Sequence, residues 1–399
     1  MERMELVLRD GHRPAADLKD FSVAEAKKAH DFHAGFAQYS QTPLTSLPGL
    51  AKALGVESIQ VKDESYRFGL NAFKVLGGSY ALGRYIAKTL GENIENLPAN
   101  RILSDEVREK LGQLTFVTAT DGNHGRGVAW TANQLGQKSV VYMPKGSAQE
   151  RLDNIRAEGA DASITDMNYD DAVRLADKHA REYGWVMVQD TAWEGYTDIP
   201  LWIMQGYTTV GYEMMSQLEE RPTHLFLQAG VGSMAGAMAG FFAGLYGENR
   251  PKIIIVEPNR ADCLFRTAKA NDGTLHSVTG DMNTIMAGLA CGEPCSIGWK
   301  VLESVADGFL SVPESVAADG MRILASPCRG DSPIVSGESG AAAFGAAANI
   351  LLDQELADMK QQLGLDAHSR LLFISTEGDT DRENYRNVVW RGKYPGVTR

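Results

Sequence analysis

The stretch HLFLQAGVGSMAG, residues 224–236, joins an apolar run to a glycine loop and then to a segment rich in small residues. The apolar run predicts a buried strand, and the segment after the loop predicts a helix. Backbone N–H groups of such a loop, together with the amino end of the helix, form a binding site for phosphate. The order of strand, glycine loop and helix is typical of an α/β fold with a parallel sheet.

Strand-like runs alternate with helical spacing through most of the chain. The segments 147–158, 169–183 and 234–246 have the apolar spacing of helices. This alternation predicts an α/β fold with two domains, each a largely parallel sheet flanked by helices. We expect a large domain from 1–79 and 206–399, with a small domain from 80–205 inserted into it. The expected strands are 58–64, 114–120, 138–144, 160–165, 185–190, 224–230, 252–258 and 371–377.

Composition and charge restrict the class of protein. The chain has 399 residues, 44% hydrophobic and 23% charged, which is ordinary for a globular protein of two domains. A formal net charge of −12 argues against nucleic acids and anionic membranes as partners. No apolar run reaches the roughly 18 residues of a spanning helix. The first residues lack the apolar core of a signal peptide, so we expect a cytoplasmic protein.

The cysteines are too few for a disulfide scaffold. They form no CxxC pair, and no histidine cluster accompanies the two at 291 and 295, so we expect no metal site. Reduced thiols are the favoured state in the expected compartment. If one bridge forms, Cys263 and Cys291 are the first pair to consider. The four cysteines are Cys263, Cys291, Cys295 and Cys328.

Polar or glycine-rich loops follow four of the expected strands, at 120–125, 190–195, 230–236 and 375–381. Ligands of parallel α/β sheets bind beyond the carboxyl ends of the strands. We therefore expect the four loops to contribute to one site.

Lys74 lies in RFGLNAFKVLGG, where a turn at Gly69 and Asn71 gives way to a helix. The helix dipole disfavours the ammonium form of an amine at the amino end of a helix. A lysine in such a place can form a Schiff base with an aldehyde. An isolated lysine is usually only a solvated charge. The assignment of Lys74 as a Schiff-base lysine therefore depends on the other elements of the site.

Several polar residues at the strand ends have a functional and a structural interpretation. Asp121 and Asn123, in the loop DGNHG, suit ligand binding, but either could cap the helix that follows. Asp190 ends the run WVMVQD and could equally cap a turn. Ser375 and Thr376 could offer a hydroxyl to a ring nitrogen, or cap the next helix.

The glycine loop also permits a nicotinamide interpretation. Gly230, Gly232 and Ala235 match the G-x-G-x-x-G/A pattern of dinucleotide-binding proteins. Glu257 lies at the end of the next strand, where an acid that binds ribose is expected. An NAD-dependent oxidoreductase would use these residues, but it would leave Lys74 and the other three loops without a function.

A phosphate loop, a Schiff-base lysine, an amide and a hydroxyl are the groups that bind pyridoxal 5′-phosphate. The chain resembles the fold-type II pyridoxal-phosphate enzymes of the serine/threonine dehydratase and tryptophan synthase β superfamily. Ala72-Phe73-Lys74 is similar to the family's Ser-Phe-Lys motif, and Gly122-Asn123-His124 is similar to its Ser-Gly-Asn-His loop. The other similar segments are 205–208, 230–233, 336–340 and 376–379; all occur in the family's order, over residues 60–381.

The resemblance implies pyridoxal 5′-phosphate as the cofactor and a homodimer as the assembly. At the pyridine nitrogen it implies Thr376, with Ser375 as the alternative. The cofactor-binding residues that it implies are Lys74, Asn123, Gly230, Val231, Gly232, Ser233, Met234, Glu338 and Thr376 or Ser375.

Asp121 departs from the dehydratases, which have Ser or Thr before Gly-Asn-His. This acid and the segments 189–200 and 286–294 resemble the branch of the family that cleaves 2,3-diaminopropionate. That branch implies α,β-elimination of both the D and L enantiomers to pyruvate and two ammonia. Asp121 and Asp190 would hold the distal ammonium group, and Lys74 and Asp121 would act as bases on opposite faces of Cα.

The expected partner is thus a small diamino acid, and Lys74, Asp121 and Asp190 are the expected catalytic residues. The expected substrate-binding residues are Thr120, Asp121, Gly122, His124 and Asp190. Three alternatives remain open: a serine/threonine dehydratase, an NAD-dependent oxidoreductase and a non-catalytic ligand-binding relative.

Overall fold

The computed structural model describes residues 3–9, 13–120 and 122–396. Contacts divide the chain into two compact units. Unit 1 comprises Met1–Leu18, Thr42–Tyr66 and Met214–Arg399, and unit 2 comprises Lys19–Gln41 and Arg67–Glu213. The chain therefore crosses from one unit to the other after residues 18, 41, 66 and 213.

Unit 1 is built, in its described part, on a seven-stranded sheet with the order β1-β10-β9-β8-β11-β3-β2. The five inner strands are parallel, and β1 and β2 join the two edges in the antiparallel direction. The strands are β1 (Glu5–Leu8), β2 (Leu44–Ser46), β3 (Ser58–Asp63), β8 (His224–Gln228), β9 (Lys252–Pro258), β10 (Gly308–Val312) and β11 (Arg370–Ser375).

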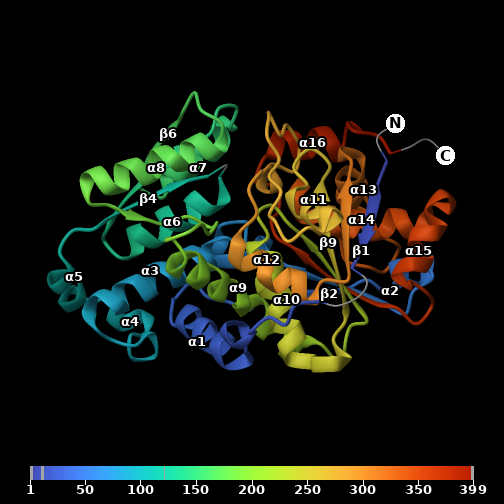
Figure 1. The fold of residues 1–399 in the computed structure, drawn as a ribbon, viewed down its shortest axis with the longest axis horizontal. Helices are drawn as coiled ribbons and strands as arrows, with labels where there is room; N and C mark the ends of the chain where they lie inside the picture. Colours follow the sequence, from blue (N-terminus) through green and yellow to red (C-terminus); the bar gives the residue numbers. More distant parts are fainter. Residues whose placement is uncertain (1–2, 10–12, 121, 397–399) are drawn as a thin grey trace. The chain divides into compact units, whose positions relative to one another are not determined.

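Helices cover this sheet because its inner strands are apolar on both faces. Phe226, Phe344 and Phe373 pack together in the core, where α14 lies against β8, β9 and β11 (Figure 1). The helices of unit 1 are α2 (Pro48–Leu54), α10 (Ser233–Tyr246), α11 (Cys263–Ala270), α12 (Ser296–Val305), α13 (Glu314–Ala325), α14 (Glu338–Leu352), α15 (Ala357–Leu363) and α16 (Arg382–Val389), with short 3₁₀ turns at Gly247–Asn249, Ala287–Leu289 and Gln354–Leu356.

Unit 2 contains a four-stranded parallel sheet, in its described part, with the order β6-β5-β4-β7. Val141 and Leu152 belong to the apolar cluster on the α6 and α7 side, and Val117 and Ala176 belong to the cluster on the α8 side. The strands are β4 (Thr115–Ala119), β5 (Lys138–Met143), β6 (Asp161–Ile164) and β7 (Val186–Met187).

In unit 2, Lys74 caps α3 and Asn123 begins α6. Helix α9 carries Glu213 and continues past that residue into unit 1. The helices are α1 (Val23–Ala34), α3 (Val75–Leu90), α4 (Ala99–Ile102), α5 (Asp105–Leu111), α6 (Asn123–Gln134), α7 (Gln149–Ala157), α8 (Tyr169–Tyr183) and α9 (Asp198–Gln217), with 3₁₀ turns at Lys19–Phe21, Glu64–Gly69 and Ile94–Asn96.

The predicted fold class is confirmed, since both sheets are largely parallel and flanked by helices. The structure adds strands β1, β2 and β10, and it shortens the expected strand at 185–190 to Val186–Met187. The boundaries expected at 79 and 206 fall inside α3 and α9. The division by contacts places 67–79 and 206–213, together with 19–41, in unit 2.

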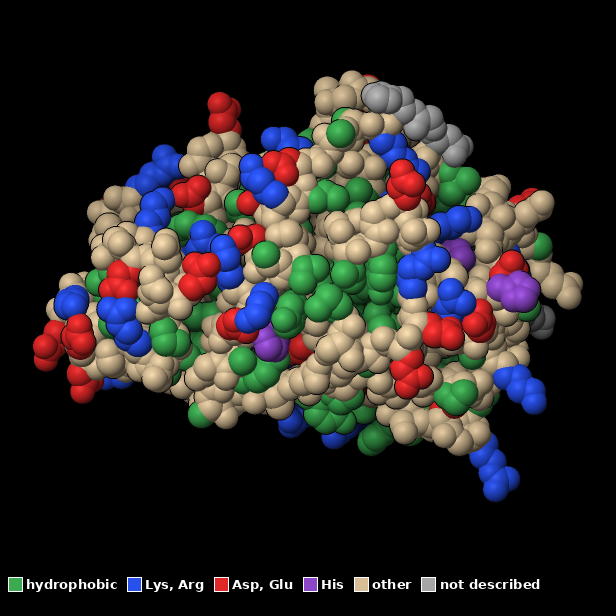
Figure 2. Space-filling model, turned by 90° about the horizontal axis from the view of Figure 1, so that it is seen from below, with side chains coloured by type: hydrophobic (Ala, Val, Ile, Leu, Met, Phe, Trp, Pro, Cys, Tyr) green, Lys and Arg blue, Asp and Glu red, His purple; other side chains and the backbone are tan. Residues whose placement is uncertain are grey.

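Three features of the structure concern the membrane, charged partners and disulfide bonds. No helix within the described residues is both long and apolar enough to cross a membrane. Figure 2 shows acidic and basic side chains intermixed over the face that it draws. The four cysteines all lie in the described part and are free thiols, so Cys263 and Cys291 are not bridged in this structure.

Candidate active site

Lys74 stands at the start of α3, in the position predicted from the sequence. It occupies the N-cap position with helical backbone angles, φ −55° and ψ −26°. The preceding turn contains Phe68, Gly69 and Asn71, whose φ angles of 51°, 71° and 60° are left-handed. The turn holds two non-glycine residues in the left-handed region, and α3 begins after it, with Lys74 as its N-cap.

Two glycines let neighbouring helices approach the Lys74 end of α3 closely. A Cβ atom on Gly127 of α6 would lie 2.7 Å from the Cα of Val75. A Cβ on Gly206 of α9 would overlap the carbonyl oxygen of Leu76. The segment 205–208 therefore acts in packing, where it helps to fix the backbone that carries Lys74.

The side chain of Lys74 donates a hydrogen bond to Oδ2 of Asp190. The Asp190 side chain is only 6% exposed, against 20% for Lys74. Burial alone would raise the pKa of Asp190, but the Lys74 ammonium and His124 lower that pKa to about 2. Asp190 is thus an ionised, buried carboxylate that is stabilised by the Lys74 ammonium.

The neighbour of Asp190, Gln189, holds the chain beyond β7, and the sequence did not reveal this role. Its Oε1 accepts from the Thr118 hydroxyl at 2.9 Å and from the Ala119 N–H at 3.1 Å. Its backbone N–H donates to the hydroxyl of Tyr196 at 2.8 Å. Gln189 therefore ties the ends of β4 and β7 together and fixes the position of Asp190.

The loop after β4 leads directly into α6. Thr120 accepts the N–H of Gly122 at 3.0 Å, and Gly122 is the N-cap residue of the helix. Asn123 is the first helical residue, so its interpretation as a helix cap is wrong. His124 donates from Nε2 to the Val188 carbonyl at 2.8 Å, which fastens α6 to the end of β7. Asp121 lies outside the described residues.

In unit 1 the glycine loop joins β8 to α10, as the sequence predicted. Gly232 is the N-cap of α10 with a φ of 94°, a backbone conformation that favours glycine. The Val231 carbonyl accepts the N–H of Cys295 at 2.8 Å, so the loop is held from outside. The N–H groups of Ser233 and Met234 belong to the first turn of α10, where backbone N–H groups point beyond the end of the helix. This geometry suits a phosphate.

The two hydroxyls at the end of β11 differ in their contacts. Ser375 donates to the Ser336 hydroxyl at 2.8 Å. Thr376 Oγ1 accepts from Nε2 of Gln228 at 2.9 Å, and this amide also donates to the Ile374 carbonyl at 2.8 Å. Because Thr376 accepts from Gln228, its hydroxyl hydrogen can be donated to a ligand.

Glu338 begins α14, beside the chain that follows β11. It is 2% exposed and accepts from Nδ2 of Asn384 at 2.5 Å. The Gly337 N–H donates to the Glu377 carbonyl at 2.9 Å, which joins the start of α14 to the end of β11. These contacts place Glu338 and Thr376 on adjacent segments of the same unit.

Glu257 has a structural role in place of the ribose contact of a dinucleotide site. Its carboxylate is fully buried and accepts the N–H groups of Leu264 at 2.9 Å and Phe265 at 2.6 Å. Burial raises the pKa of Glu257 well above its ordinary range. A carboxyl engaged at the start of α11 in this way is not available to a ribose, which removes the basis of the nicotinamide interpretation.

Each unit, taken by itself, carries groups that suit a part of pyridoxal 5′-phosphate. Unit 2 supplies an amine on Lys74, the amide of Asn123 and an ionised carboxylate. Unit 1 supplies the N–H groups of the 230–234 loop and the hydroxyl of Thr376. Both sets lie beyond the carboxyl ends of parallel strands, where such sheets bind ligands.

Comparisons with known proteins agree with this chemistry. A model of the family "Pyridoxal-phosphate dependent enzyme" matches residues 36–363. The chain is 53% identical to the diaminopropionate ammonia-lyase of Salmonella typhimurium over 367 residues, 91% of each chain. The crystal structure of the holo diaminopropionate ammonia lyase from Escherichia coli superposes with a TM-score of 0.91, at 47% identity over 98% of both chains.

A further solved structure, that of the Escherichia coli diaminopropionate ammonia lyase in complex with an aminoacrylate-PLP azomethine reaction intermediate, superposes with a TM-score of 0.89 at 47% identity and covers 98% of both chains. Similarity of this extent includes both units and every described segment of the candidate site. The chain belongs to the diaminopropionate ammonia-lyases, a group of fold-type II pyridoxal-phosphate-dependent lyases.

Proposed function

We propose that this protein catalyses the α,β-elimination of 2,3-diaminopropionate to pyruvate and two ammonia, with pyridoxal 5′-phosphate as its cofactor. Family membership supports the reaction class. The observation that carries the choice of substrate is the buried, ionised carboxylate of Asp190, which binds the Lys74 amine.

The cofactor-binding residues are assigned by their chemistry. Lys74 Nζ would bind the cofactor covalently, and Asn123 would donate to its phenolic oxygen. Glu338 would lie beside the ring, and Thr376, whose hydroxyl hydrogen can be donated, is preferred over Ser375 for the pyridine nitrogen. The phosphate would be held by Gly230, Val231, Gly232, Ser233 and Met234.

Bound pyridoxal phosphate supplies an electron sink for the pair of electrons released at the substrate's Cα. Lys74 Nζ can act as a base only when it is neutral, so during the reaction it does not supply the cation that stabilises Asp190 in the present structure. A buried carboxylate without a cation is costly. The distal ammonium of a diamino acid would restore the missing charge, whereas the hydroxyl of serine would not.

The same contact favours departure of the Cβ nitrogen. An amine leaves readily only while it is protonated, and the ionised carboxylate of Asp190 would stabilise the ammonium form by a charge-assisted hydrogen bond. Asp190 thus selects the substrate and keeps its leaving group charged. The hydrogen bond to the Val188 carbonyl holds the ring of His124 near Asp190.

Proton removal from Cα needs a base on each face if both enantiomers react. We assign one face to Nζ of Lys74, released when the substrate's α-amine takes its place, and the other to the carboxylate of Asp121. Asp121 lies between Thr120, at the end of β4, and Gly122, at the start of α6. The Thr120 hydroxyl, which Gly122 holds in place, and the N–H groups of Asn123 and His124 are assigned to the substrate's α-carboxylate.

The atoms balance with one water. Loss of the Cα proton and the Cβ amine gives one ammonia and an enamine. The enamine tautomerises to an imine after its release, and water hydrolyses the imine to pyruvate and the second ammonia. Diaminopropionate therefore yields two ammonia per pyruvate, and serine would yield one.

The test measures pyruvate and ammonia from D- and L-diaminopropionate and from D- and L-serine. We expect two ammonia per pyruvate and a kcat/KM for diaminopropionate that exceeds that for serine by up to about 10⁴-fold, as for sites that reject an unmatched polar group. Asp190→Asn should lower the ratio of kcat/KM for diaminopropionate to kcat/KM for serine. Asp198→Asn, an exposed acid of α9 paired with Lys88, should leave it unchanged.

Equal or better turnover of serine by the wild type would make the protein a dehydratase instead. Turnover that requires a nicotinamide cofactor, or a complete lack of turnover with bound pyridoxal phosphate, would support one of the other two alternatives.

We further assign the protein to the cytoplasm and to a homodimer. Support comes from the composition and from the large apolar side chain of Trp390, which is 73% exposed in unit 1 and suits a subunit contact. Light scattering of the purified holoenzyme tests the assembly. A mass of twice the chain's 43.4 kDa would support the dimer, and a monomer would overturn it.

A further inference from the structure

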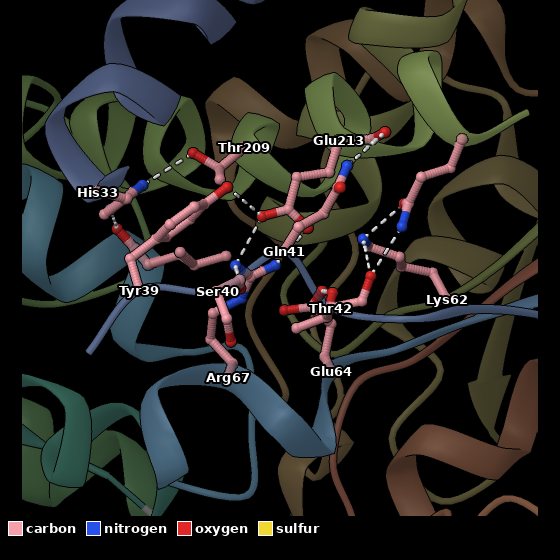
Figure 3. Close-up of polar contacts among 12 residues, drawn as sticks. His33, Tyr39, Ser40, Gln41, Thr42, Lys62, Glu64, Arg67, Thr209 and Glu213 are labelled. Atoms are coloured by element: carbon pink, nitrogen blue, oxygen red, sulfur yellow. Dashed lines mark hydrogen bonds and ion pairs between the residues drawn. The ribbon is translucent and has the colours of Figure 1, made fainter. Parts of the chain in front are cut away.

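Arg67 and Glu213 form a fully buried ion pair in unit 2 (Figure 3). Both side chains are 0% exposed. The guanidinium contacts the carboxylate at two points, Nη1 to Oε1 at 2.7 Å and Nη2 to Oε2 at 2.9 Å. This two-point geometry fixes orientation as well as distance.

The residues that end the first segment of unit 2 complete the cluster. The Tyr39 hydroxyl donates to Glu213 Oε1 at 2.8 Å, and Arg67 lies 5.8 Å from the centre of the Tyr39 ring. Arg67 also donates to the Ser40 carbonyl at 3.3 Å, and Gln41 donates to the Glu213 carbonyl at 3.4 Å. Burial and the Glu213 carboxylate raise the pKa of Tyr39, so its hydroxyl keeps the proton that it donates.

The cluster joins three distant parts of the chain. Residues 41, 67 and 213 are the points where unit 2 is left or re-entered at three of the four crossings. Replacing a buried ion pair by apolar residues is often neutral or stabilising, so such a pair is weak evidence of a stabilising role. Its two-point geometry points to a positional role.

Arg67 begins the turn that leads to Lys74. The Leu70 N–H donates to the Arg67 carbonyl at 2.9 Å. Three left-handed residues follow between 68 and 71, and such a turn persists only if its surroundings hold it. The anchor at the start of this turn therefore bears on where α3 begins.

Glu213 lies on α9, the helix that packs beside the start of α3. It lies two turns after Gly206, whose backbone contacts the Leu76 carbonyl at the start of α3. Tyr207 packs against Phe73 with ring centres 4.7 Å apart. Both the turn before Lys74 and the helix packed beside it are thus fastened to one ion pair.

We infer that Arg67 and Glu213 are positioning residues that set the place of Lys74 Nζ, an inference that rests on the proposed function of Lys74. They act through the backbone of 67–74 and through α9. Loss of the pair lets the turn relax and moves the amine from its working position.

The experiment compares the wild-type holoenzyme with Arg67→Lys and Glu213→Gln. Arg67→Lys keeps the charge but loses the two-point contact, and Glu213→Gln keeps the shape but loses the charge. We expect kcat for diaminopropionate to fall about 10- to 100-fold, as for small displacements of reacting groups, with little change in KM. Hydrogen exchange of amides 68–76 should become faster in both variants.

The matched control is a second Arg–Glu pair of unit 2, Arg101 and Glu92, which also has two-point contacts but is partly exposed, at 38% and 27%. Arg101→Lys and Glu92→Gln should leave kcat and exchange at 68–76 unchanged. Trapping of the cofactor on Lys74 by borohydride, identified by peptide mass, gives a measure that is independent of turnover, and it should slow only in the Arg67 and Glu213 variants.

The outcomes separate the two proposals. A wild type that traps no cofactor on Lys74 would refute the proposed function. A wild type that traps it, with Arg67 and Glu213 variants that fold and keep wild-type kcat, trapping rate and exchange, would overturn the inference. If Glu213→Gln does not fold, Tyr39→Phe takes its place, because it removes one hydrogen bond to Glu213. Tyr39→Phe should change kcat, the trapping rate and the exchange at 68–76 in the same direction but by less. Wild-type values of all three in Tyr39→Phe would also overturn the inference.

Discussion

The amine of Lys74 and the carboxylate of Asp190 are hydrogen-bonded to each other, although 116 positions separate them in the chain. One residue starts a helix and the other follows the short strand β7. The pair places a cation beside a buried carboxylate, and this contact keeps Asp190 ionised.

Replacement of Lys74 by Ala and by Arg separates the covalent role of this residue from its charge. Both variants should fail to trap pyridoxal phosphate with borohydride. Lys74→Ala leaves a buried carboxylate without its cation, so its free energy of unfolding at pH 7, measured by urea titration of the cofactor-free protein, should fall by about 1–3 kcal/mol. Lys74→Arg keeps a cation and should lose less. Cofactor trapped in Lys74→Ala would contradict the assignment.

Asp121→Asn tests the second base. The change keeps shape and hydrogen bonding but removes the proton acceptor, so turnover of one enantiomer of diaminopropionate should be abolished and much of the other spared. The measurement is kcat/KM for each enantiomer. Small and equal losses for both would reduce Asp121 to a structural residue of the loop before α6.

Gly232→Asp tests the phosphate loop. The φ of 94° disfavours a side chain, a Cβ would lie 3.1 Å from Leu264, and the new charge would repel phosphate. Equilibrium dialysis should show weaker binding of pyridoxal phosphate. Gly244→Asp is the control, since it adds the same charge to the same helix at a site where a Cβ meets nothing within 4 Å. Equal affinities in the two variants would refute the loop assignment.

His33 predicts a fall in stability in mild acid. Burial and then the Arg67 guanidinium lower its pKa from 6.5 to about 3. Its Nδ1 contacts Thr209 at 2.8 Å (Figure 3), and its Nε2 contacts the Leu76 carbonyl at 3.0 Å. The unfolded chain therefore binds the proton more readily. The contribution of His33 is fully present above pH 6.5 and is lost as pH falls towards 3.

The measurement is the free energy of unfolding between pH 7.5 and 5. In the wild type this residue should contribute a loss of up to about 1.4 kcal/mol for each pH unit below its unfolded pKa. His33→Gln should be less stable at neutral pH but should show a flatter pH dependence. Exposed His368 serves as the control, and an unchanged slope in His33→Gln would refute the prediction.

Much of the fold was predictable because buried parallel strands are short apolar runs that are visible without their partners. Edge strands are not, since β2 has only three residues and gains its identity by pairing with β3. The expected strand at 185–190 ended early because Gln189 turns its side chain to the end of β4. Such long-range bonds leave no local pattern in the sequence.

The site divides in the same way. Lys74, the loop at 230–234 and Thr376 stand next to turns and strand ends that the sequence marks. The sequence did not indicate a role for Gln228 or for the Arg67–Glu213 pair. A glutamine inside a strand has no visible partner in the sequence, and neither do two charges 146 positions apart. Their contacts exist only in the folded chain.

The order of the strands has a consequence for biosynthesis. Arg370, at the start of β11, bonds Glu57, beside the start of β3, across 313 positions of the chain. Every segment of unit 2 has left the ribosome once residue 213 has emerged, so this unit can fold during translation. Strands β1 and β3 are made early, but their partners β10 and β11 follow only after unit 2. Until then the nascent chain carries these strand edges unpaired, and an unpaired strand edge is a template for aggregation. Unit 1 is therefore the part of the chain that we expect to aggregate during synthesis.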